Sequence, residues 1–590
     1  MKFYKFIKPN KLLFIFLLII ISSSLRVLWV DAVPPGLNRD EAAIGYTAYS
    51  ILKTGRDEFG RFLPLSLESF GDWKLPLYVY FTVPSIFFFG LTEFSVRLVS
   101  ILCGVGTVVL TYFLTLRFMK DKKTAYLAAI IIAISPWHIF FSRVASEANL
   151  AVFLTTLAVL LLTYVRHRPQ LLILVSSLFV LTLESYHRNH IFTPFLFIGL
   201  LINYRKEFFS RPWGPVSIAI FAVCAGIIFS QTLFSADKTK ISGLLAVNDI
   251  SVVHENIVKN RLIFHSPFLG KVFNNKILFS VENILQNYAR TFSPEFLFIK
   301  GGGNAQHNIP LSGNLYLIEA PFFILGLFFL FHKKEPSAPL FLFWILISSI
   351  GAALTKDAPH SARQFAIFPI LPIIIAYGIR QVIILIPNRP VRKIAAASLT
   401  LGFVVSLGVF ISRYFVIFPY RSYQVWGGPY KEMAIKLNNK KTDTHIITAR
   451  PDYSMYIYYL FYNRVDPKLV QTSLKRYPPT DEGFVHAHSF QNLTFRKIDW
   501  ADDLLRPNNL YVDWVETVPY GATHSAVLIT SALLKDLDTR GIVIPQITVG
   551  AVVKSELIDE VKLPDNTPYM YFIKTSIDTM SPNQLNKQSL

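Results

Sequence analysis

Apolar runs long enough to cross a bilayer dominate the first two thirds of the chain. A membrane-spanning helix needs roughly 17 to 25 mostly apolar residues, and runs of this length recur up to about residue 415. The pattern predicts an α-helical polytopic membrane protein with about eleven transmembrane helices, near residues 12 to 30, 96 to 118, 124 to 141, 149 to 165, 170 to 185, 190 to 203, 213 to 231, 312 to 331, 338 to 355, 364 to 386 and 394 to 415.

The apolar segment from Leu75 to Phe89 is not counted among these spans. It is short and contains Pro76 and Pro84. If it crossed the bilayer, every later loop would change sides and the distribution of basic loops would invert. We therefore expect a re-entrant or interfacial segment that lies against the bundle.

Basic residues mark alternate connections, and such loops face the cytoplasm in most membrane proteins. The N-terminus is therefore expected in the cytoplasm, and an odd number of spans places the C-terminal part outside. This assigns residues 31–95 and 232–311, and the short turn 355–363, to the outer face. The basic residues are Lys2, Lys5, Lys8 and Lys11 at the N-terminus, then Arg117, Lys120, Lys122, Lys123, Arg166, Arg168, Arg205, Lys206, Arg211, Lys333, Lys334, Arg389, Arg392 and Lys393.

The composition changes after the last apolar run. His445 to Thr448 and Ala526 to Thr530 have the pattern of buried strands, and Met455 to Tyr462 has that of a helix. We expect two domains, a transmembrane domain over residues 1–415 and an extracytoplasmic α/β domain over residues 416–590.

Charge and cysteine usage exclude two classes of site. The net charge is +20, but residues 418–590 carry nineteen Lys and Arg against eighteen Asp and Glu, so the excess marks membrane loops and not a nucleic-acid groove. Both cysteines, Cys103 and Cys224, fall in apolar runs, so no disulfide and no cysteine-based metal site is expected.

The polar residues with the strongest claim to chemistry follow the first apolar run, at Arg39, Asp40 and Glu41. Ionisable side chains are costly near hydrocarbon, so such a cluster needs either solvent or a task. The alternative is a solvated turn in which Asp40 or Glu41 caps the next helix.

Other polar residues also gather on the outer face. His360 and Arg363 suit a lipid phosphate at the mouth of a bundle. For three further segments a structural role is favoured: His138 as an interfacial anchor, His187 to His190 as a solvated turn, and Gly301 to Gly303 as a flexible turn.

Several short motifs occur together and in a familiar order. They are Arg39-Asp40-Glu41, Thr54-Gly55-Arg56-Asp57-Glu58-Phe59-Gly60, Leu63-Pro64-Leu65, Pro76-Leu77-Tyr78, Ser135-Pro136-Trp137-His138 and His360-Ser361-Ala362-Arg363. Over residues 1–415 the chain resembles the bacterial relatives of dolichyl-phosphate-mannose protein mannosyltransferases, membrane glycosyltransferases of the GT-C class that also includes the aminoarabinose transferases acting on lipid A. The C-terminal domain departs from the β-trefoil module of the eukaryotic enzymes.

The resemblance implies that a sugar moves from a polyprenyl-phosphate donor to an acceptor on the outer face, the acceptor being a protein, lipid or glycan. It implies a general base at Asp40 with Glu41, because a hydroxyl is a poor nucleophile until a carboxylate takes its proton. Transfer with one carboxylate would invert the anomeric centre. The leaving lipid phosphate needs cations, for which the candidates are Arg363, His360, His307, Lys300 and Lys74. Candidate residues of the donor or acceptor pocket are Arg39, Asp57, Glu58 and His187.

No cofactor is required by this chemistry and no metal ligand is assigned, although a divalent metal stays an alternative. Two other functions also stay open. A polyprenyl-linked oligosaccharide transferase or ligase would share the architecture and the outer-face site. A lipid or sugar transporter would place ionisable residues in mid-span beside broken helices, and the centres of the predicted spans lack such residues.

Overall fold

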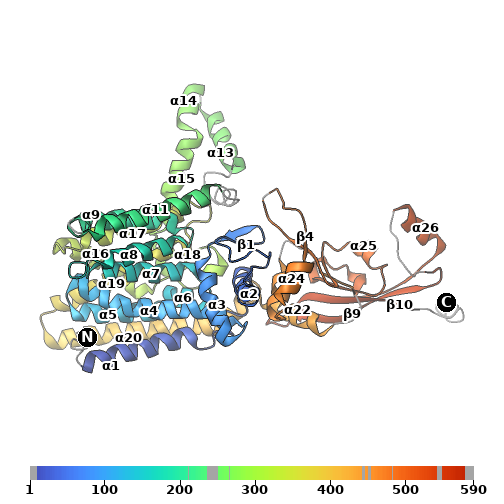
Figure 1. The fold of residues 1–590 in the computed structure, drawn as a ribbon, viewed down its shortest axis with the longest axis horizontal. Helices are drawn as coiled ribbons and strands as arrows, with labels where there is room; N and C mark the ends of the chain where they lie inside the picture. The colour runs from blue at the N-terminus through green and yellow to red at the C-terminus, as the bar shows by residue number, and fades with distance from the viewer. Residues whose placement is uncertain are drawn as a thin grey trace. The chain divides into compact units, whose positions relative to one another are not determined.

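The computed structural model describes residues 9–209, 212–234, 250–264, 266–440, 445–448, 454–481, 483–540 and 548–578. The chain forms two compact units (Figure 1). The first contains residues 1–34, 64–67 and 72–422, and the second contains residues 35–63, 68–71 and 423–590. The first loop therefore contributes residues 35–63 to the unit that holds the C-terminal sheet, which the expected boundary near residue 415 did not foresee.

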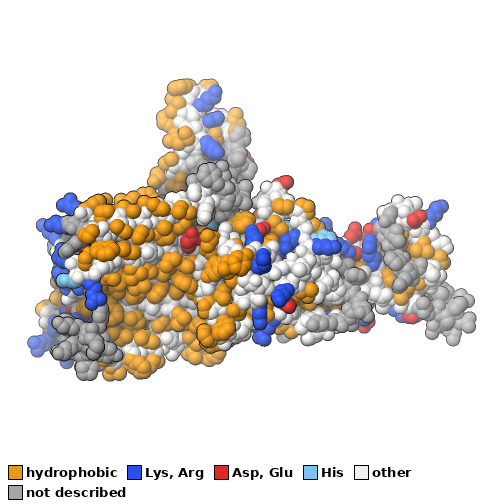
Figure 2. Space-filling model, in the orientation of Figure 1, with side chains coloured by type: hydrophobic (Ala, Val, Ile, Leu, Met, Phe, Trp, Pro, Cys, Tyr) orange, Lys and Arg blue, Asp and Glu red, His pale blue; other side chains and the backbone are white. Residues whose placement is uncertain are grey.

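The first unit is helical. Most of its helices are apolar along their whole length, and hydrophobic side chains cover much of its surface (Figure 2). Its helices are α1 (Pro9–Val27), α3 (Leu77–Phe89), α4 (Glu93–Met119), α5 (Lys122–Ile134), α6 (Pro136–Arg143), α7 (Glu147–Leu162), α8 (Leu171–Leu183), α9 (Asn189–Asn203), α10 (Arg205–Phe209), α11 (Trp213–Phe234), α13 (Ile250–Ile263), α14 (Pro267–Phe273), α15 (Lys276–Arg290), α16 (Ala320–His332), α17 (Ala338–Ala353), α18 (Ser361–Gln364), α19 (Ile370–Leu385), α20 (Arg389–Ile411) and α21 (Phe418–Arg421).

The expected eleven spans are not confirmed by helix length and composition. Among the described residues three helices are long and apolar enough to cross a membrane, at Glu93–Met119, Trp213–Gln231 and Arg389–Arg421. Two further pairs of helices pass the same test only if each bent pair counts as one span. The other apolar helices have 10–17 residues, and α3, from the segment with two prolines, has 13.

Lys and Arg side chains gather at one end of the helical unit, on the left of Figure 2. This clustering fits basic loops that share one side of a membrane. Which side that is stays a prediction, and Lys2, Lys5 and Lys8 lie outside the described residues.

Two apolar runs that the sequence shows as continuous are broken in the structure. The run near 124–141 divides at Ser135 into α5 and α6, which meet at 54°. The run near 364–386 divides into Ser361–Ile367 and Ile370–Leu385, at 59°. A proline lies at each break, Pro136 directly after the first and Pro369 within the second, and its ring clashes with a helical turn that precedes it. The first break lies in the Ser-Pro-Trp-His motif, and the second follows the short helix that begins in the His-Ser-Ala-Arg motif.

Three fully buried arginines hold the end of α1 and the start of the first loop. Arg97 donates to the carbonyl of Val30 (2.6 Å). Arg143 donates to the carbonyl of Leu25 (3.1 Å), and Arg26 to the carbonyl of Ala133 in α5 (3.1 Å). A buried guanidinium left without acceptors would be very costly, so these bonds fix where the chain leaves the helical bundle.

The second unit contains α2 (Arg39–Thr54) and a mixed eight-stranded sheet. The strand order is β4-β5-β6-β3-β7-β10-β9-β8, with β3 parallel to both of its neighbours. Its other elements are β3 (His445–Thr448), β4 (Lys475–Arg476), β5 (Ala487–Phe490), β6 (Leu493–Phe495), β7 (Asn509–Trp514), β8 (His524–Leu528), β9 (Val552–Lys562), β10 (Pro568–Asp578), α22 (Gly428–Asn439), α23 (Met455–Tyr462), α24 (Pro467–Ser473), α25 (Trp500–Asp503) and α26 (Ser531–Thr539). The expected C-terminal α/β fold is thus present.

Candidate functional site

The predicted base and its neighbour have different roles at the start of α2. Asn38 is the N-cap: its Oδ1 accepts from the backbone N–H of Glu41 (2.9 Å), and its own N–H donates to Glu41 Oε2 (3.3 Å). This capping box satisfies the donors at the helix start. Glu41 is buried by it, whereas Asp40 takes no part in it and is half-buried. The alternative in which Asp40 or Glu41 caps the helix therefore holds for Glu41, as the third residue of the capping box, whereas the N-cap itself is Asn38 and Asp40 lies outside the box.

Close backbone packing within the second unit fixes this helix start. Gly36 has φ +99°, and a Cβ there would lie 2.9 Å from the carbonyl oxygen of Trp426. A side chain at this position would therefore clash and would also be strained. The start of α2 therefore packs tightly against the loop before α22. This packing fixes the position of the backbone that carries Asp40.

Two aromatic residues surround the Arg39-Asp40-Glu41 motif. The Arg39 guanidinium lies 5.1 Å from the centre of the Phe70 ring, at cation–π distance. Tyr458 of α23 is buried and close enough to the motif for its pKa to respond: burial raises this pKa, Asp40 raises it further and Arg39 lowers it. Tyr458 was missed at the sequence level, because the helix was predicted but its contact with the first loop was not.

Asp57 shapes the loop after α2. Its Oδ1 accepts from the N–H groups of Phe59 (3.0 Å) and Arg61 (2.9 Å), and its Oδ2 accepts from Arg61 Nε (2.8 Å). Gln471 of α24 donates to the Asp57 carbonyl (2.9 Å). Since these bonds use both carboxylate oxygens, Asp57 orders the turn in this structure, and its predicted place in a substrate pocket stays a prediction.

Glu58 is the most perturbed carboxylate of this loop. Its Oε1 accepts from the Tyr456 hydroxyl (2.9 Å) and lies 3.8 Å from Arg476 Nη2. Burial raises the pKa of Glu58 to about 7, and Asp57 and Glu68 raise it further, against the lowering effect of Arg476 and Tyr456. A carboxyl that titrates near neutrality is a common feature of functional sites and also of structural ion-pair clusters.

Three of the five candidate phosphate ligands come together in the first unit. The rings of His307 and His360 have their centres 4.7 Å apart. Arg363 pairs with Asp357 and donates to Thr355 Oγ1 (2.6 Å), and Asp357 Oδ2 lies 3.6 Å from His360 Nε2. Burial, His307 and Arg363 hold the pKa of His360 well below its usual value, so His360 is neutral at pH 7. Arg363, whose guanidinium is always protonated, is the permanently charged member of the group.

The other two candidate ligands have different surroundings. The Lys300 ammonium is exposed and pairs with Glu295 (2.7 Å). Lys74 is buried and follows Trp73, whose carbonyl lies 3.2 Å from His187 Nε2. Of the five candidate cations, the structure thus groups His307, His360 and Arg363, and the phosphate role of each stays a prediction.

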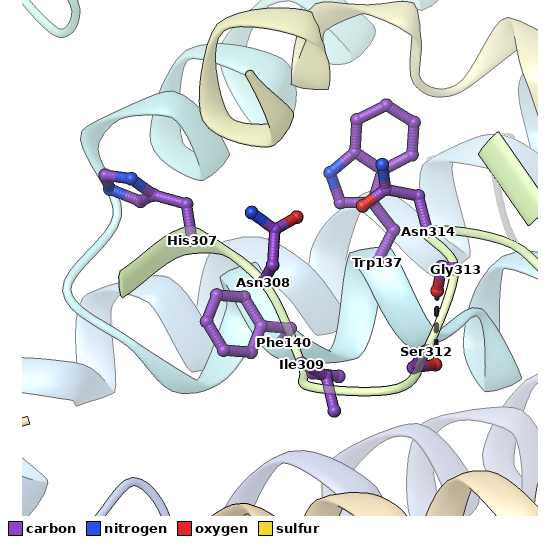
Figure 3. A pocket seen from close by; sticks show the side chains of 8 residues that line it. All are labelled: Trp137, Phe140, His307, Asn308, Ile309, Ser312, Gly313 and Asn314. Carbon is purple, nitrogen blue, oxygen red and sulfur yellow. Dashed lines mark hydrogen bonds between the residues drawn. The ribbon is translucent and has the colours of Figure 1, made fainter. Parts of the chain in front are cut away.

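A polar network joins the two broken helices beside these residues. The Ser361 hydroxyl contacts Asn308 Oδ1 (2.5 Å) and Asn314 Oδ1 (3.0 Å). Trp137 donates from its indole to the Ser361 carbonyl (3.2 Å). Asn308 and Asn314 also line a small pocket together with Trp137 (Figure 3). The pocket has a volume of about 10 Å³, which is enough for one water molecule. The network therefore fixes the loop that carries His307 relative to the His-Ser-Ala-Arg motif.

Two of the three segments that were assigned structural roles, His138 and the glycine turn, have surroundings that differ from the expectation. His138 is fully buried and its Nδ1 lies 2.8 Å from Arg26 Nη2, so the expectation of an interfacial anchor is wrong. In the glycine turn, Gly302 donates to Asn308 Oδ1 (2.8 Å), and a Cβ at Gly302 would lie 2.8 Å from the Pro359 carbonyl oxygen. This turn is packed against the outer loop and is not a free connection.

No group of three or more His, Cys, Asp or Glu side chains is placed to hold a metal ion within the part of the chain that the structure describes. The alternative of a divalent metal is left untested by this geometry, since two protein ligands with water and substrate can also hold such an ion.

Residues 18–183 match the family model of dolichyl-phosphate-mannose-protein mannosyltransferase. This segment includes the Arg39-Asp40-Glu41 and Ser135-Pro136-Trp137-His138 motifs and covers less than a third of the chain. The resemblance to dolichyl-phosphate-mannose protein mannosyltransferases is thereby confirmed over this segment. A comparison with curated proteins finds no match.

The solved structures that this chain resembles are distant from it in sequence. ArnT from Cupriavidus metallidurans, bound to undecaprenyl phosphate, has a TM-score of 0.49 and 11% identity, with 95% of this chain and 97% of that chain covered. The oligosaccharyltransferase AglB from Archaeoglobus fulgidus, in complex with an inhibitory peptide and a dolichol-phosphate, has 0.44 and 13%, with 76% and 63% covered. The arabinofuranosyltransferase AftD from Mycobacteria has 0.36 and 11%, with 96% and 40% covered. The chain spans less than two thirds of AglB and AftD, and at these TM-scores the likenesses carry no conclusion about its chemistry.

Proposed function

We propose that this protein transfers a sugar from a polyprenyl-phosphate donor to an acceptor hydroxyl at the outer face of a membrane, with inversion at the anomeric carbon. The observation that carries the proposal is the start of α2, which lies inside the segment matching the mannosyltransferase family model. There the capping box engages Glu41 and not its neighbour Asp40. Asp40 is the group we assign as general base.

The proposed role of Asp40 follows from the chemistry of the acceptor. A hydroxyl attacks well only if its proton is removed as the new bond forms, and a positioned carboxylate contributes about 10²–10⁴-fold to such a step. Arg39, held over the Phe70 ring, is a fixed positive charge beside this carboxylate and is assigned to orienting donor or acceptor. Which sugar and which acceptor are used is left open by these residues.

The departing group in this reaction is a lipid phosphate, and its charge needs donors that do not have to reorganise. Arg363 is assigned to this role because its guanidinium is permanently charged and suits phosphate oxygens. His360, neutral at pH 7, would supply a ring N–H and not a charge, and the His307 ring lies close to it at a tilt. Asp357, which pairs with Arg363 and is partly exposed, would have to give way when phosphate binds.

One structural observation favours a second function. The two broken helix pairs, with Arg26 and His138 buried beside one break, are features that secondary transporters also show. A transporter of lipid-linked sugar would need a sealed compartment to do measurable work, whereas a transferase works in detergent.

The test is therefore made with purified protein in detergent and a panel of polyprenyl-phosphate sugars. Release of polyprenyl phosphate supports the transferase, provided that the sugar is recovered either free, after transfer to water, or attached to an acceptor. If detergent-solubilised protein is inactive on every donor, and reconstituted protein moves the same donors across vesicle membranes, the proposal is wrong.

A further inference from the structure

Helices α13, α14 and α15 form a hairpin that stands away from the bundle (Figure 1). Ser266 caps α14, where Pro267 takes the first helical position, and Asn275 Oδ1 caps α15 by accepting from the N–H of Leu278 (3.0 Å). Arg261 of α13 donates to the carbonyl of Asn274 in the turn (2.7 Å). Helices α14 and α15 thus begin at defined N-caps, and α13 is tied to the turn between them.

Large apolar side chains on this hairpin are exposed instead of buried. On α15, Ile277, Val281 and Leu285 recur every four residues, which places them on one face, and Ile277 is 75% exposed. On α14, Phe268 is 74% exposed and Phe273 60%. A continuous apolar face on two neighbouring helices is more than the scattered single residues normal for a protein surface.

The hairpin is attached to the end of the bundle opposite the basic loops. Since those loops are predicted to be cytoplasmic, this is the predicted outer end. Near the end of α15, Asn287 donates to the carbonyls of Ala353 and Thr355 (both 3.4 Å), at the end of α17. The opposite end of α17 follows Lys333 and Lys334, among the predicted cytoplasmic residues. The hairpin base therefore lies beside the turn that leads to Arg363.

The direction of the hairpin also matters. In Figure 1 α14 and α15 run across the direction of α4 and α20, which are among the helices long enough to span a membrane. A helix that lies across spanning helices at their end runs along the membrane surface. In Figure 2 hydrophobic side chains line the left side of the hairpin, the side toward which the bundle extends.

Charge favours a lipid surface over other occupants. Lys271 precedes the apolar Val272 and Phe273, and Lys276 precedes Ile277 and Leu278; both lysines are exposed. Long basic side chains beside an apolar face can extend to phosphate headgroups while their stems remain in the apolar layer.

We propose that helices α14 and α15 of this hairpin insert their apolar face into the outer leaflet of the membrane, with Lys271 and Lys276 on anionic lipid headgroups. The hairpin then holds the loop beside Arg363 at the depth of the lipid phosphates. This role does not depend on which reaction the protein catalyses, because it concerns how the outer loop is positioned at the bilayer surface.

The test uses nitroxide labels on two neighbouring positions that face different ways. Val281→Cys lies on the apolar face and Glu282→Cys beside it on the polar face, each placed in a full-length Cys103→Ala, Cys224→Ala background and reconstituted in nanodiscs. We expect the oxygen-to-nickel-chelate accessibility ratio to be several-fold higher at 281 than at 282. Equal ratios at the two positions would place the hairpin in water and overturn the proposal.

Two further readouts separate the remaining outcomes. Broadening of the 281 spectrum by spin–spin interaction would mean that the apolar face meets a second copy of the chain, which also overturns the proposal. Adding phosphatidylglycerol to phosphatidylcholine nanodiscs should deepen the label at 281, and Lys271→Gln with Lys276→Gln should remove this response. A depth that does not respond to phosphatidylglycerol in the unmodified hairpin would contradict the role of the two lysines.

Discussion

Replacing Glu58 by Gln should stabilise the second unit at neutral and alkaline pH. The Glu58 carboxyl is buried, with Tyr456 donating to Oε1 and Arg476 at 3.8 Å. Burial, reinforced by Asp57 and Glu68, raises its pKa from 4.5 to about 7. The folded state thus holds the proton at pH values where the unfolded chain has already released it.

The sign of the pH dependence follows from this difference. Below about pH 4.5 both states carry the proton, and the contribution of Glu58 to stability is fully present. As pH rises through 4.5 to about 7 that contribution is lost, because the unfolded state ionises first. At about 1.4 kcal/mol for each unit of pKa, the loss is on the order of 3 kcal/mol above pH 7.

Gln at position 58 keeps the shape of the side chain and can still accept from the Tyr456 hydroxyl, but it cannot ionise. At pH 8 we expect Glu58→Gln to be more stable than the wild type by about 1–3 kcal/mol, and at pH 5 the two should be nearly equal. For a unit of roughly 200 residues this corresponds to a rise in Tm of several degrees. The assay is thermal unfolding of the full-length protein in detergent, followed by tryptophan fluorescence at one fixed scan rate.

Asp57→Asn is the matched control. Both oxygens of the Asp57 carboxylate accept hydrogen bonds, including one from Arg61 Nε (2.8 Å). Its replacement should therefore destabilise, by about 1–2 kcal/mol, through the loss of charge-assisted bonds. Two adjacent carboxylates then give opposite results. The reasoning is refuted if Glu58→Gln lowers Tm at pH 8, or if its Tm keeps the wild-type slope between pH 5 and 8.

Three further predictions concern topology and the phosphate group. A reporter that is active only in the cytoplasm, fused after Leu590, should be silent, and a strong signal would show that the C-terminal domain faces the cytoplasm. Arg363→Ala should weaken donor binding, with partial recovery in Arg363→Lys because the charge returns without the planar fork; titration of folded protein with a polyprenyl-phosphate sugar checks this, and unchanged affinity in both variants would remove Arg363 from the site. Because the pKa of His360 lies well below its usual value, His360→Gln should leave the pH profile of donor affinity unchanged between pH 6 and 8, and a step present only in the wild type would contradict this.

Several secondary-structure elements of the second unit could be predicted from the sequence. Residues 445–448 and 455–462 form the strand and helix that their patterns predict. The buried strand expected at 526–530 is instead the edge strand β8 (His524–Leu528), whose residues are exposed or half-buried. The type and length of an apolar run are local information, so they can be recognised without knowledge of the tertiary fold. The contribution of residues 35–63 to the same unit could not be predicted, since it joins segments nearly 400 residues apart.

The candidate site was predictable in its residue types and less so in their roles. Asn38 and Glu41 have the spacing of a capping box, so the true N-cap could have been read from the sequence. Pro136 likewise marks the break at 135. By contrast, Arg26 and His138 are joined through contacts between distant helices, and the low pKa of His360 depends on its burial against His307. Neither follows from local pattern.

The most direct test of the proposed function is turnover of the Asp40→Asn variant with a polyprenyl-phosphate sugar donor that the wild type accepts. Asn keeps the shape of Asp but cannot accept a proton, so turnover should fall by about two to four orders of magnitude with donor affinity little changed. Glu41→Gln, which preserves the capping box at Asn38, should lose far less. Near-normal turnover of Asp40→Asn, in protein folded as well as the wild type, would contradict the assignment of Asp40 as general base.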